Sequence, residues 1–335
     1  MPASAPSRQV ASRLLDHYRV HARVLPWRAP PGSAQPDPYL VWLSEVMLQQ
    51  TTVATVVPRF LRFVERWPNV EALAVASDAE ILGEWAGLGY YARARNLIFC
   101  ARQVAAMGGF PDTEVELRAL PGIGDYTAAA IAAIAFGRDS VAIDTNVERV
   151  VARLEATSDK ATIRAAAAAL VPSGQAGDFA QAMMDLGATL CRPRAPDCAA
   201  CPISIDCRAL ALGTPEGFPA KVARNARPVR FGTAWWVERK DALWLVRRPA
   251  KGLLGGMAAL PGPVWGDVPV TEQVLAEVRH GFTHFELRLA VIAVGAADGE
   301  GWWQPIERLA EAGLPTLYRR AVEAVLDQRR QLAAS

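Results

Sequence analysis

The sequence predicts a multidomain protein in which an all-α domain is followed by an α+β domain. Three observations support this division. Residues 8–212 are dominated by apolar residues at helical spacing, and residues 213–230 are rich in Pro, Gly and Arg. From residue 231 onward, short aromatic and β-branched segments replace the helical pattern. A chain of 335 residues is long enough for each domain to bury its own core.

The individual elements follow from local patterns. In the first domain, residues 1–212, Ala- and Leu-rich segments repeat at helical spacing and end near Gly or Pro, which predicts helices at 9–20, 78–88, 127–137 and 163–171. Residues 213–230 are predicted to be an extended linker. In the second domain, residues 231–335, the patterns predict strands within 232–240, 242–248 and 285–296, and a final helix over 316–332.

One further helix carries an isolated acid. Residues 41–57 are almost wholly apolar or neutral except for Glu45, and Asp37 followed by Pro38 is a helix start signal. At helical spacing Glu45 falls beside apolar side chains. It either reaches solvent or a backbone amide, or it is a general acid whose pKa burial has raised. The segment alone leaves both open.

Composition excludes a membrane protein. Apolar residues make up 51% of the chain, but no apolar run approaches the roughly 20 residues that a membrane span needs. The N-terminus lacks the apolar core of a signal peptide, so a cytoplasmic protein is expected. Net charge is only +2, yet residues 90–102 and 218–230 carry only positive charges, mostly Arg. These basic segments are a weak indication of nucleic-acid binding.

Four of the five cysteines form a compact set at residues 191–207. They are spaced C-x6-C-x2-C-x5-C, at Cys191, Cys198, Cys201 and Cys207, whereas Cys100 lies apart. Disulfides are not expected in a cytoplasmic chain. Both zinc and an iron–sulfur cluster accept four thiolates from such a loop, and spacing does not choose between them.

Two more motifs carry possible site residues. One suggests a phosphate-binding site, and the other contains a second acid. "LPGIGDYTA" (120–128) predicts a tight hairpin between helices, in which Gly122 and Gly124 let the backbone approach a DNA phosphate at a helix N-terminus. "VAIDTNVERV" places Asp144 at an expected helix N-cap. The alternative interpretations are that the hairpin is only a packing corner between two helices and that Asp144 is only a helix N-cap.

Together these motifs resemble the endonuclease III superfamily of DNA base-excision glycosylases, and in detail its MutY branch, the adenine DNA glycosylases. The matching segments span most of the first domain: residues 25–28, 42–51, 87–97, 120–128, 181–188 and the cysteine loop. The resemblance implies a helix-hairpin-helix fold. It also implies one 4Fe-4S cluster on the four cysteines in place of zinc.

The resemblance also assigns catalytic roles. Glu45 would protonate adenine, and Asp144 would stabilise or attack the cationic sugar, because neutral adenine is a poor leaving group. Asn146 and Tyr126 would order the sugar, the phosphate and the water. Bifunctional relatives carry Lys where this chain has Tyr126, so a monofunctional enzyme is expected. The family usually reads Asp-Gly-Asn, and Thr145 replaces that Gly, which puts the local backbone geometry in doubt.

Further residues align with those that handle the extruded base, because chemistry on a base requires taking it out of the duplex. Residues around the adenine or in the space it leaves would be Arg23, Trp27, Arg28, Leu48 and Gln50. Residues at the opposing base would be the wedge Tyr90 and its neighbours Leu88 and Thr51.

The second domain resembles a Nudix fold through residues 245–262. The stretch after Gly262 lacks the acidic cluster that binds magnesium in Nudix enzymes, so neither catalytic magnesium nor a nucleotide cofactor is expected. "GFTHFEL" (281–287) matches the MutY loop that inspects 8-oxoguanine, with Thr283 in place of the usual Ser beside His284. Thr keeps the hydroxyl.

The sequence therefore predicts a monofunctional glycosylase in base excision repair that removes adenine opposite 8-oxoguanine or guanine in duplex DNA. It is expected to act as a monomer, associated with the nucleoid if the source is bacterial. Two rivals are a thymine or uracil mismatch glycosylase, which the second domain disfavours, and a catalytically silent lesion-binding protein, which the two acids disfavour.

Overall fold

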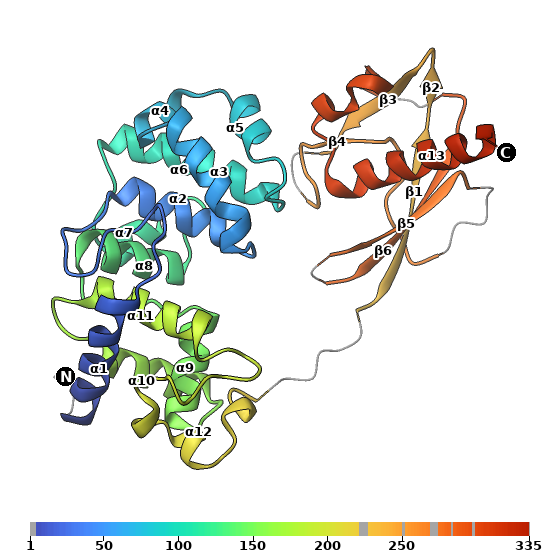
Figure 1. Cartoon of the computed structure of the whole chain (residues 1–335). Helices are drawn as coiled ribbons and strands as arrows, with labels where there is room; N and C mark the ends of the chain where they lie inside the picture. The colour runs from blue at the N-terminus through green and yellow to red at the C-terminus, as the bar shows by residue number, and fades with distance from the viewer. Residues whose placement is uncertain are drawn as a thin grey trace. The chain divides into compact units, whose positions relative to one another are not determined.

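The computed structural model describes residues 5–220, 227–249, 252–268, 274–282, 284–296 and 299–334. These residues form two compact units (Figure 1). One comprises Met1–Glu84 with Arg93–Val222, and the other Trp85–Ala92 with Ala223–Ser335. The expected fold class is confirmed, because the first unit is helical and the second combines strands with helices. No helix of the described ranges is both long and apolar enough for a membrane crossing.

The helical unit is built from short helices joined by tight turns. Its helices are α1 (Ala5–His21), α2 (Pro38–Leu48), α3 (Val53–Arg66), α4 (Val70–Val75), α5 (Asp78–Glu84), α6 (Tyr91–Met107), α7 (Glu114–Arg118), α8 (Asp125–Phe136), α9 (Thr145–Glu155), α10 (Lys160–Leu170), α11 (Ala176–Thr189) and α12 (Arg208–Ala211), with 3-10 turns η1 (Ser204–Asp206) and η2 (Pro215–Gly217). Helix α8 packs against α2, α7 and α11. Its residues Thr127–Ala135 are all buried, so the Ala-rich sequence forms the centre of this unit.

The hairpin between α7 and α8 has the backbone that its glycines predict. Gly122 has φ +77°, and a Cβ there would lie 2.7 Å from the Cβ of Asn96. Gly124 has an extended backbone and is the N-cap of α8, with no side chain to cap the helix. The first amide groups of α8 therefore have no side-chain cap.

The α+β unit consists of two small sheets and a helix that packs against them. Its elements are β1 (Val229–Trp236), β2 (Glu238–Arg239), β3 (Ala242–Arg247), β4 (Ala258–Ala259), β5 (Ala276–Gly281), β6 (Glu286–Ala293), β7 (Trp302–Pro305), η3 (Ile306–Ala312) and α13 (Thr316–Ala334). Strand β6 lies between β1, which is parallel to it, and β5, which is antiparallel. Strand β3 pairs antiparallel with β2, β4 and β7. The core joins residues of both sheets, such as Leu289 and Leu245, with Val322 of α13.

Two boundaries differ from the sequence prediction. Strand β1 begins at Val229, two residues inside the predicted linker, because Val229 and Arg230 continue the parallel ladder with β6. The predicted helix at 78–88 ends at Glu84, since Gly87 and Gly89 have positive φ and the chain turns there.

Candidate active site

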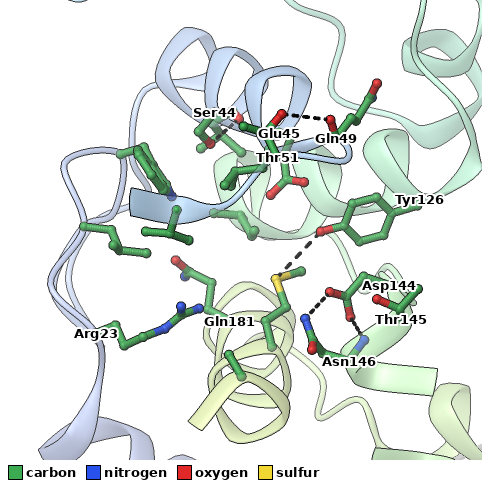
Figure 2. Close-up of a pocket in the computed structure, with 18 of the residues that line it drawn as sticks. Arg23, Ser44, Glu45, Gln49, Thr51, Tyr126, Asp144, Thr145, Asn146 and Gln181 are labelled. Carbon is green, nitrogen blue, oxygen red and sulfur yellow. Dashed lines mark hydrogen bonds between the residues drawn. The ribbon is translucent and has the colours of Figure 1, made fainter. Parts of the chain in front are cut away.

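A cavity of about 850 Å³ lies in the helical unit and gathers all of the predicted catalytic and adenine-pocket residues (Figure 2). Ten of the predicted residues line it: Arg23, Trp27, Arg28, Glu45, Leu48, Gln50, Thr51, Tyr126, Asp144 and Asn146. They come from the α1–α2 connection, α2 and the turn after it, and the N-termini of α8 and α9. Segments separated by more than a hundred residues thus meet at one site of the size that small-molecule ligands occupy.

Glu45 is held inside this cavity by an otherwise apolar helix. Helix α2 begins as predicted, with Asp37 accepting a hydrogen bond from Tyr39 N at 2.8 Å and Pro38 in the first turn. The Glu45 side chain belongs to a buried stretch and is only 8% exposed. Its burial raises the pKa of its carboxyl to about 7, and the negative charge of Asp144 acts in the same direction. Tyr126, as a hydrogen-bond partner, and Arg28 oppose this rise in the pKa.

Asp144 lies in the opposite environment. It is the N-cap of α9, and its Oδ1 accepts hydrogen bonds from Asn146 N at 2.9 Å and Val147 N at 2.7 Å. Its Oδ2 accepts a third bond from Asn146 Nδ2 at 2.7 Å. Three donors and a helix N-terminus all favour a negative charge at this position. The cavity thus brings a carboxyl with a raised pKa together with a carboxyl that accepts three hydrogen bonds, an arrangement suited to acid catalysis beside a developing cation.

The backbone at the Asp144 motif is ordinary. Thr145 is not among the described residues with positive φ, so the replacement of Gly introduces no strain. Close packing occurs instead on the partner helix, where a Cβ on Gly187 would lie 2.5 Å from the Cβ of Asn146. Gly187 therefore lets α11 approach the start of α9.

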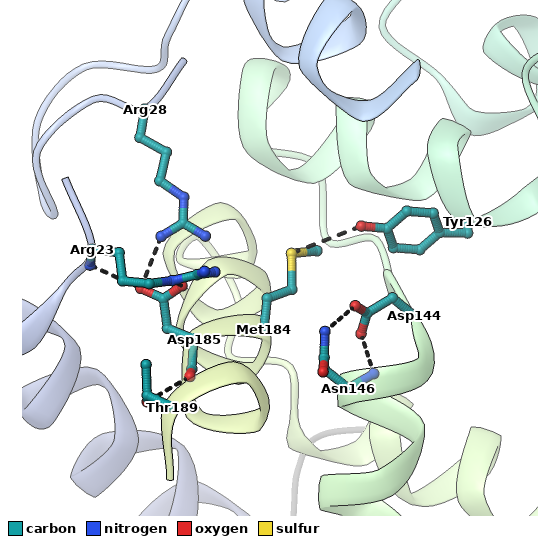
Figure 3. A network of polar contacts seen from close by, with 8 residues as sticks. All are labelled: Arg23, Arg28, Tyr126, Asp144, Asn146, Met184, Asp185 and Thr189. Carbon is teal, nitrogen blue, oxygen red and sulfur yellow. Dashed lines mark hydrogen bonds and ion pairs between the residues drawn. The ribbon is translucent and has the colours of Figure 1, made fainter. Parts of the chain in front are cut away.

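Tyr126 projects from the first turn of α8 into the cavity. Its hydroxyl donates to the Met184 sulfur at 3.8 Å, as Figure 3 shows. Burial raises the pKa of Tyr126 well above its usual value, and the charges of Glu45 and Asp144 act in the same direction. The phenol therefore stays neutral and can act as a hydrogen-bond donor.

Sequence reasoning missed an acid that fixes the predicted adenine-pocket arginines. Asp185 of α11 accepts hydrogen bonds from Arg23 Nε at 2.6 Å, Arg23 N at 2.9 Å and Arg28 Nη1 at 2.8 Å (Figure 3). Both Arg28 and Asp185 have side chains only 8% exposed. The segment 181–188 resembles the family as a whole. The sequence signal for this role is an acid four residues after Gln181 on an otherwise apolar helix. Gln181 and Met184, also unpredicted, line the cavity.

The other predicted residues lie outside this cavity. Leu88 is buried, whereas Tyr90 is 53% exposed and has φ +48°. Gly122 and Gly124 lie in the hairpin described above. In the second unit His284 is exposed, and Thr283 lies outside the described residues.

The four clustered cysteines line a second, smaller cavity together with Arg153. Arg153 is 2% exposed, and its Nη1 donates to Cys191 Sγ at 3.3 Å and to Arg192 O at 2.8 Å. Burial raises the pKa of Cys201 to about 11, and the other three cysteines act in the same direction. Four sulfur donors beside a buried, positively charged guanidinium suit an anionic metal–thiolate group. Among the described residues, no group of three or more His, Cys, Asp or Glu side chains already has metal-binding geometry.

The pKa of Glu45 predicts a pH dependence for any reaction that uses it as an acid. The protonated form is the active one, so the rate should be flat below pH 7 and fall toward tenfold per pH unit above it. The pKa of Glu45 is higher in the folded protein than in the unfolded chain, so the protein is most stable where Glu45 is protonated in both states. The free energy of unfolding should therefore decrease as the pH rises from about 4.5 through 7. Single-turnover rates measured from pH 6 to 9 check the first effect. A flat profile would contradict the assignment of Glu45.

Comparison with known proteins agrees with this architecture. Residues 43–173 match the model of the HhH-GPD superfamily base excision DNA repair proteins, and residues 233–324 match the NUDIX domain. A structure of a thermostable thymine-DNA glycosylase matches 62% of this chain, and the match includes 98% of that glycosylase's chain. The identity is 30% and the TM-score is 0.55. A structure of an endonuclease III–DNA covalent intermediate has the same fold over 62% of this chain, with 23% identity and a TM-score of 0.52.

Curated relatives are similar across both units. The adenine DNA glycosylase of Arabidopsis thaliana is 38% identical over 77% of this chain, which spans about half (48%) of that relative's length. The human enzyme is 34% identical over 86% of this chain and 67% of its own. The mouse enzyme is 32% identical over 95% of this chain and 78% of its own. With the helix-hairpin-helix unit, the Nudix-like unit and the two acids of the cavity, these matches establish that the chain belongs to the adenine DNA glycosylase family.

Proposed function

We propose that this protein is a monofunctional DNA glycosylase that removes adenine opposite 8-oxoguanine, with adenine opposite guanine as a secondary substrate. The observation that carries the proposal is the pairing of Glu45 with Asp144 in one cavity, where the pKa of Glu45 is raised to about 7. Hydrolysis of the N-glycosidic bond needs a proton donor at the base and a negative charge at the sugar.

The reaction follows from this geometry. Adenine extruded from the duplex enters the cavity, and Glu45 donates its proton to a ring nitrogen as the bond to the sugar breaks. Asp144 stabilises the oxocarbenium-like sugar and helps position the water that attacks it. Arg23 and Arg28, fixed by Asp185, form the polar wall of the cavity. A preorganised wall costs no reorganisation at the moment of reaction.

A hydrolytic outcome is favoured over strand cleavage. Opening of the sugar through a Schiff base needs an amine nucleophile. No lysine is among the described residues that line the cavity, and Tyr126 stands at the hairpin position. The neutral phenol cannot form the covalent intermediate.

The direct test is base release from duplexes that hold A, T or U opposite guanine or 8-oxoguanine. Release of adenine alone, with strand breaks only after alkali, is the expected result. Release of thymine or uracil would favour the mismatch-glycosylase alternative. Tight binding without release of any base would make the protein a lesion-binding module.

The four clustered cysteines are proposed to hold one 4Fe-4S cluster. All four cysteines line one cavity, and Arg153 places a positive charge beside Cys191, which suits a cluster with negatively charged thiolates. When bound, such a cluster would tie together the loop of residues 191–207, which follows α11 and packs near the C-terminal end of α9. Zinc on the same four sulfurs is the alternative.

The cluster proposal makes a spectroscopic prediction. Protein purified without oxygen should be yellow-brown, with broad near-ultraviolet and visible absorption, and Cys198→Ser should weaken or abolish that absorption by removing one thiolate. Cys100→Ser is the matched control, because Cys100 is buried in α6 apart from the other four. Stoichiometric zinc without iron in the native protein would contradict the proposal.

The second domain is proposed to read the opposing base. Its core joins both sheets with α13, and the sequence after Gly262 lacks the acidic cluster that binds magnesium in Nudix enzymes. The exposed His284 lies two residues before β6, between Phe282 and Phe285 in the sequence, whose stacked rings have centroids 4.8 Å apart. Such a rigid aromatic base can support a recognition loop. In the first domain Tyr90, Leu88 and Thr51 are proposed to contact the distorted duplex.

Replacing Thr283 and His284 together by Ala should reduce the preference for 8-oxoguanine over guanine about tenfold or more. Lost hydrogen bonds at a recognition site cost on the order of 1–3 kcal/mol of selectivity. Release of adenine opposite guanine should be nearly unchanged, because the cavity is in the other domain. Paired single-turnover rates on the two duplexes measure the effect. An unchanged ratio would mean that the lesion is read elsewhere.

A further inference from the structure

Helix α2 carries Glu45 but ends without the usual means of satisfying its last carbonyl groups. Its C-cap is Gln49, with φ −55° and ψ +113°, rather than a left-handed Gly. The next residue, Gln50, has φ +57°, a conformation that is uncommon for residues other than Gly. Such a turn persists only where surrounding contacts hold it in place.

One arginine from another helix makes these contacts. Arg93, in the first turn of α6, donates from Nη1 to Val46 O at 2.8 Å and to Met47 O at 3.0 Å. Its Nη2 donates to Thr51 Oγ1 at 3.2 Å. The planar guanidinium thus spans the last turn of α2 and the turn that follows it, which a single ammonium group cannot do.

The turn itself adds two bonds to this arrangement. Thr51 N donates to Leu48 O at 3.1 Å, and Thr51 Oγ1 donates to Gln49 O at 3.3 Å. Thr51 therefore both closes the turn and accepts a bond from Arg93. A positive charge at this end of α2 also complements the helix dipole.

From these contacts we infer that Arg93 is a positioning residue for the reaction: it fixes the C-terminal turn of α2, and with it Glu45, Leu48 and Gln50 at the cavity. Val46, whose carbonyl it binds, is the residue directly after Glu45. Arg93 lies three residues after Tyr90 in the sequence. The effect of Arg93 on catalysis rests on the proposed function. Its effect on the structure of the α2 turn rests on geometry alone.

A positioning role differs from an electrostatic one. Burial, Tyr126, Asp144 and Arg28 set the pKa of Glu45, and Arg93 is not among these causes. Loss of Arg93 should therefore misplace the acid without moving the midpoint of the pH profile. A 1 Å displacement of a reacting group is enough to cost about a hundredfold in rate.

The test uses the full-length protein with Arg93→Met, Arg93→Lys and a matched control, Arg102→Met. Arg102 lies on the same helix and binds carbonyl groups at the end of α4, Ala74 O at 3.3 Å and Ala76 O at 3.4 Å, away from the cavity. Amide hydrogen exchange of residues 46–52 in the absence of DNA should be at least tenfold faster in Arg93→Met and unchanged in Arg102→Met. Arg93→Lys should be intermediate.

Single-turnover adenine release should be at least tenfold slower in Arg93→Met than in the wild type, with the same pH midpoint. If Arg93→Met folds poorly, Thr51→Val supplies a second route, because it removes the hydroxyl through which Arg93 reaches the turn, together with the bond from that hydroxyl to Gln49 O, and it should accelerate the same amide exchange. Unchanged exchange of residues 46–52 in both variants would overturn the positioning role. Faster exchange in a protein whose wild type releases no adenine would leave that role intact and reject the proposed function.

Discussion

Glu45→Gln should lower the rate of adenine release by at least about a hundredfold, the lower range for removal of a general acid. Glutamine keeps the size and hydrogen-bonding capacity of the side chain but has no proton of suitable pKa to give. Because Glu45 is neutral at low pH and 8% exposed, its neutral amide replacement should fit the buried site. The loss should therefore appear in the chemical step, measured by single-turnover release from an adenine–guanine duplex.

The matched control is Glu148→Gln. Glu148 also lines the cavity, in the first turn of α9, and is only partly buried, so it lacks the environment of a proton donor. It should cost far less activity than Glu45→Gln, and both variants should still bind duplex DNA. Two results would remove Glu45 from its role: near-normal release by Glu45→Gln, or a pH profile of that variant that still falls above pH 7.

How much of this site the sequence could predict depends on whether the signal is local. The N-caps Asp37 and Asp144 are encoded by a few adjacent residues, and each is a helix N-cap in the structure. The glycines of the hairpin are likewise local, and Gly122 has the left-handed backbone that its turn requires. The apolar residues at helical spacing around Glu45 allowed its burial as one of two interpretations, and the structure shows it 8% exposed. These features depend on φ/ψ preferences and on the period of the helix.

Other features depend on tertiary proximity, which no local pattern encodes. Asp185 binds Arg23 and Arg28 across more than 150 residues of sequence, and only the packing of α11 beside the α1–α2 connection brings them together. The approach of Gly187 to Asn146 and the contact of Arg93 with α2 are of the same kind. In the second domain, β1 begins earlier than its composition suggests because the parallel ladder with β6 overrides the linker-like residues.

Asp144→Asn should also lower adenine release by at least about a hundredfold, but for an electrostatic reason. As the sugar becomes cationic, a partly buried carboxylate stabilises it far more than a neutral amide can. The three N–H donors around Asp144 are fixed before the reaction and hold the carboxylate in place. An amide at the same position can still accept the two backbone bonds through its oxygen, but its NH2 group cannot accept the bond from Asn146 Nδ2, and it brings no charge.

Asparagine is as good an N-cap as aspartate, so α9 should remain folded and the melting temperature should change little. This separates loss of charge from loss of structure. The matched control is Asp159→Asn, at the N-cap of α10, where the side chain accepts a hydrogen bond from Thr162 N at 2.7 Å on an exposed surface. It should leave adenine release unchanged within about twofold. Should Asp144→Asn release adenine as fast as this control, the stabilising charge must come from another group, and the pairing of acid and carboxylate in the cavity would no longer explain the reaction.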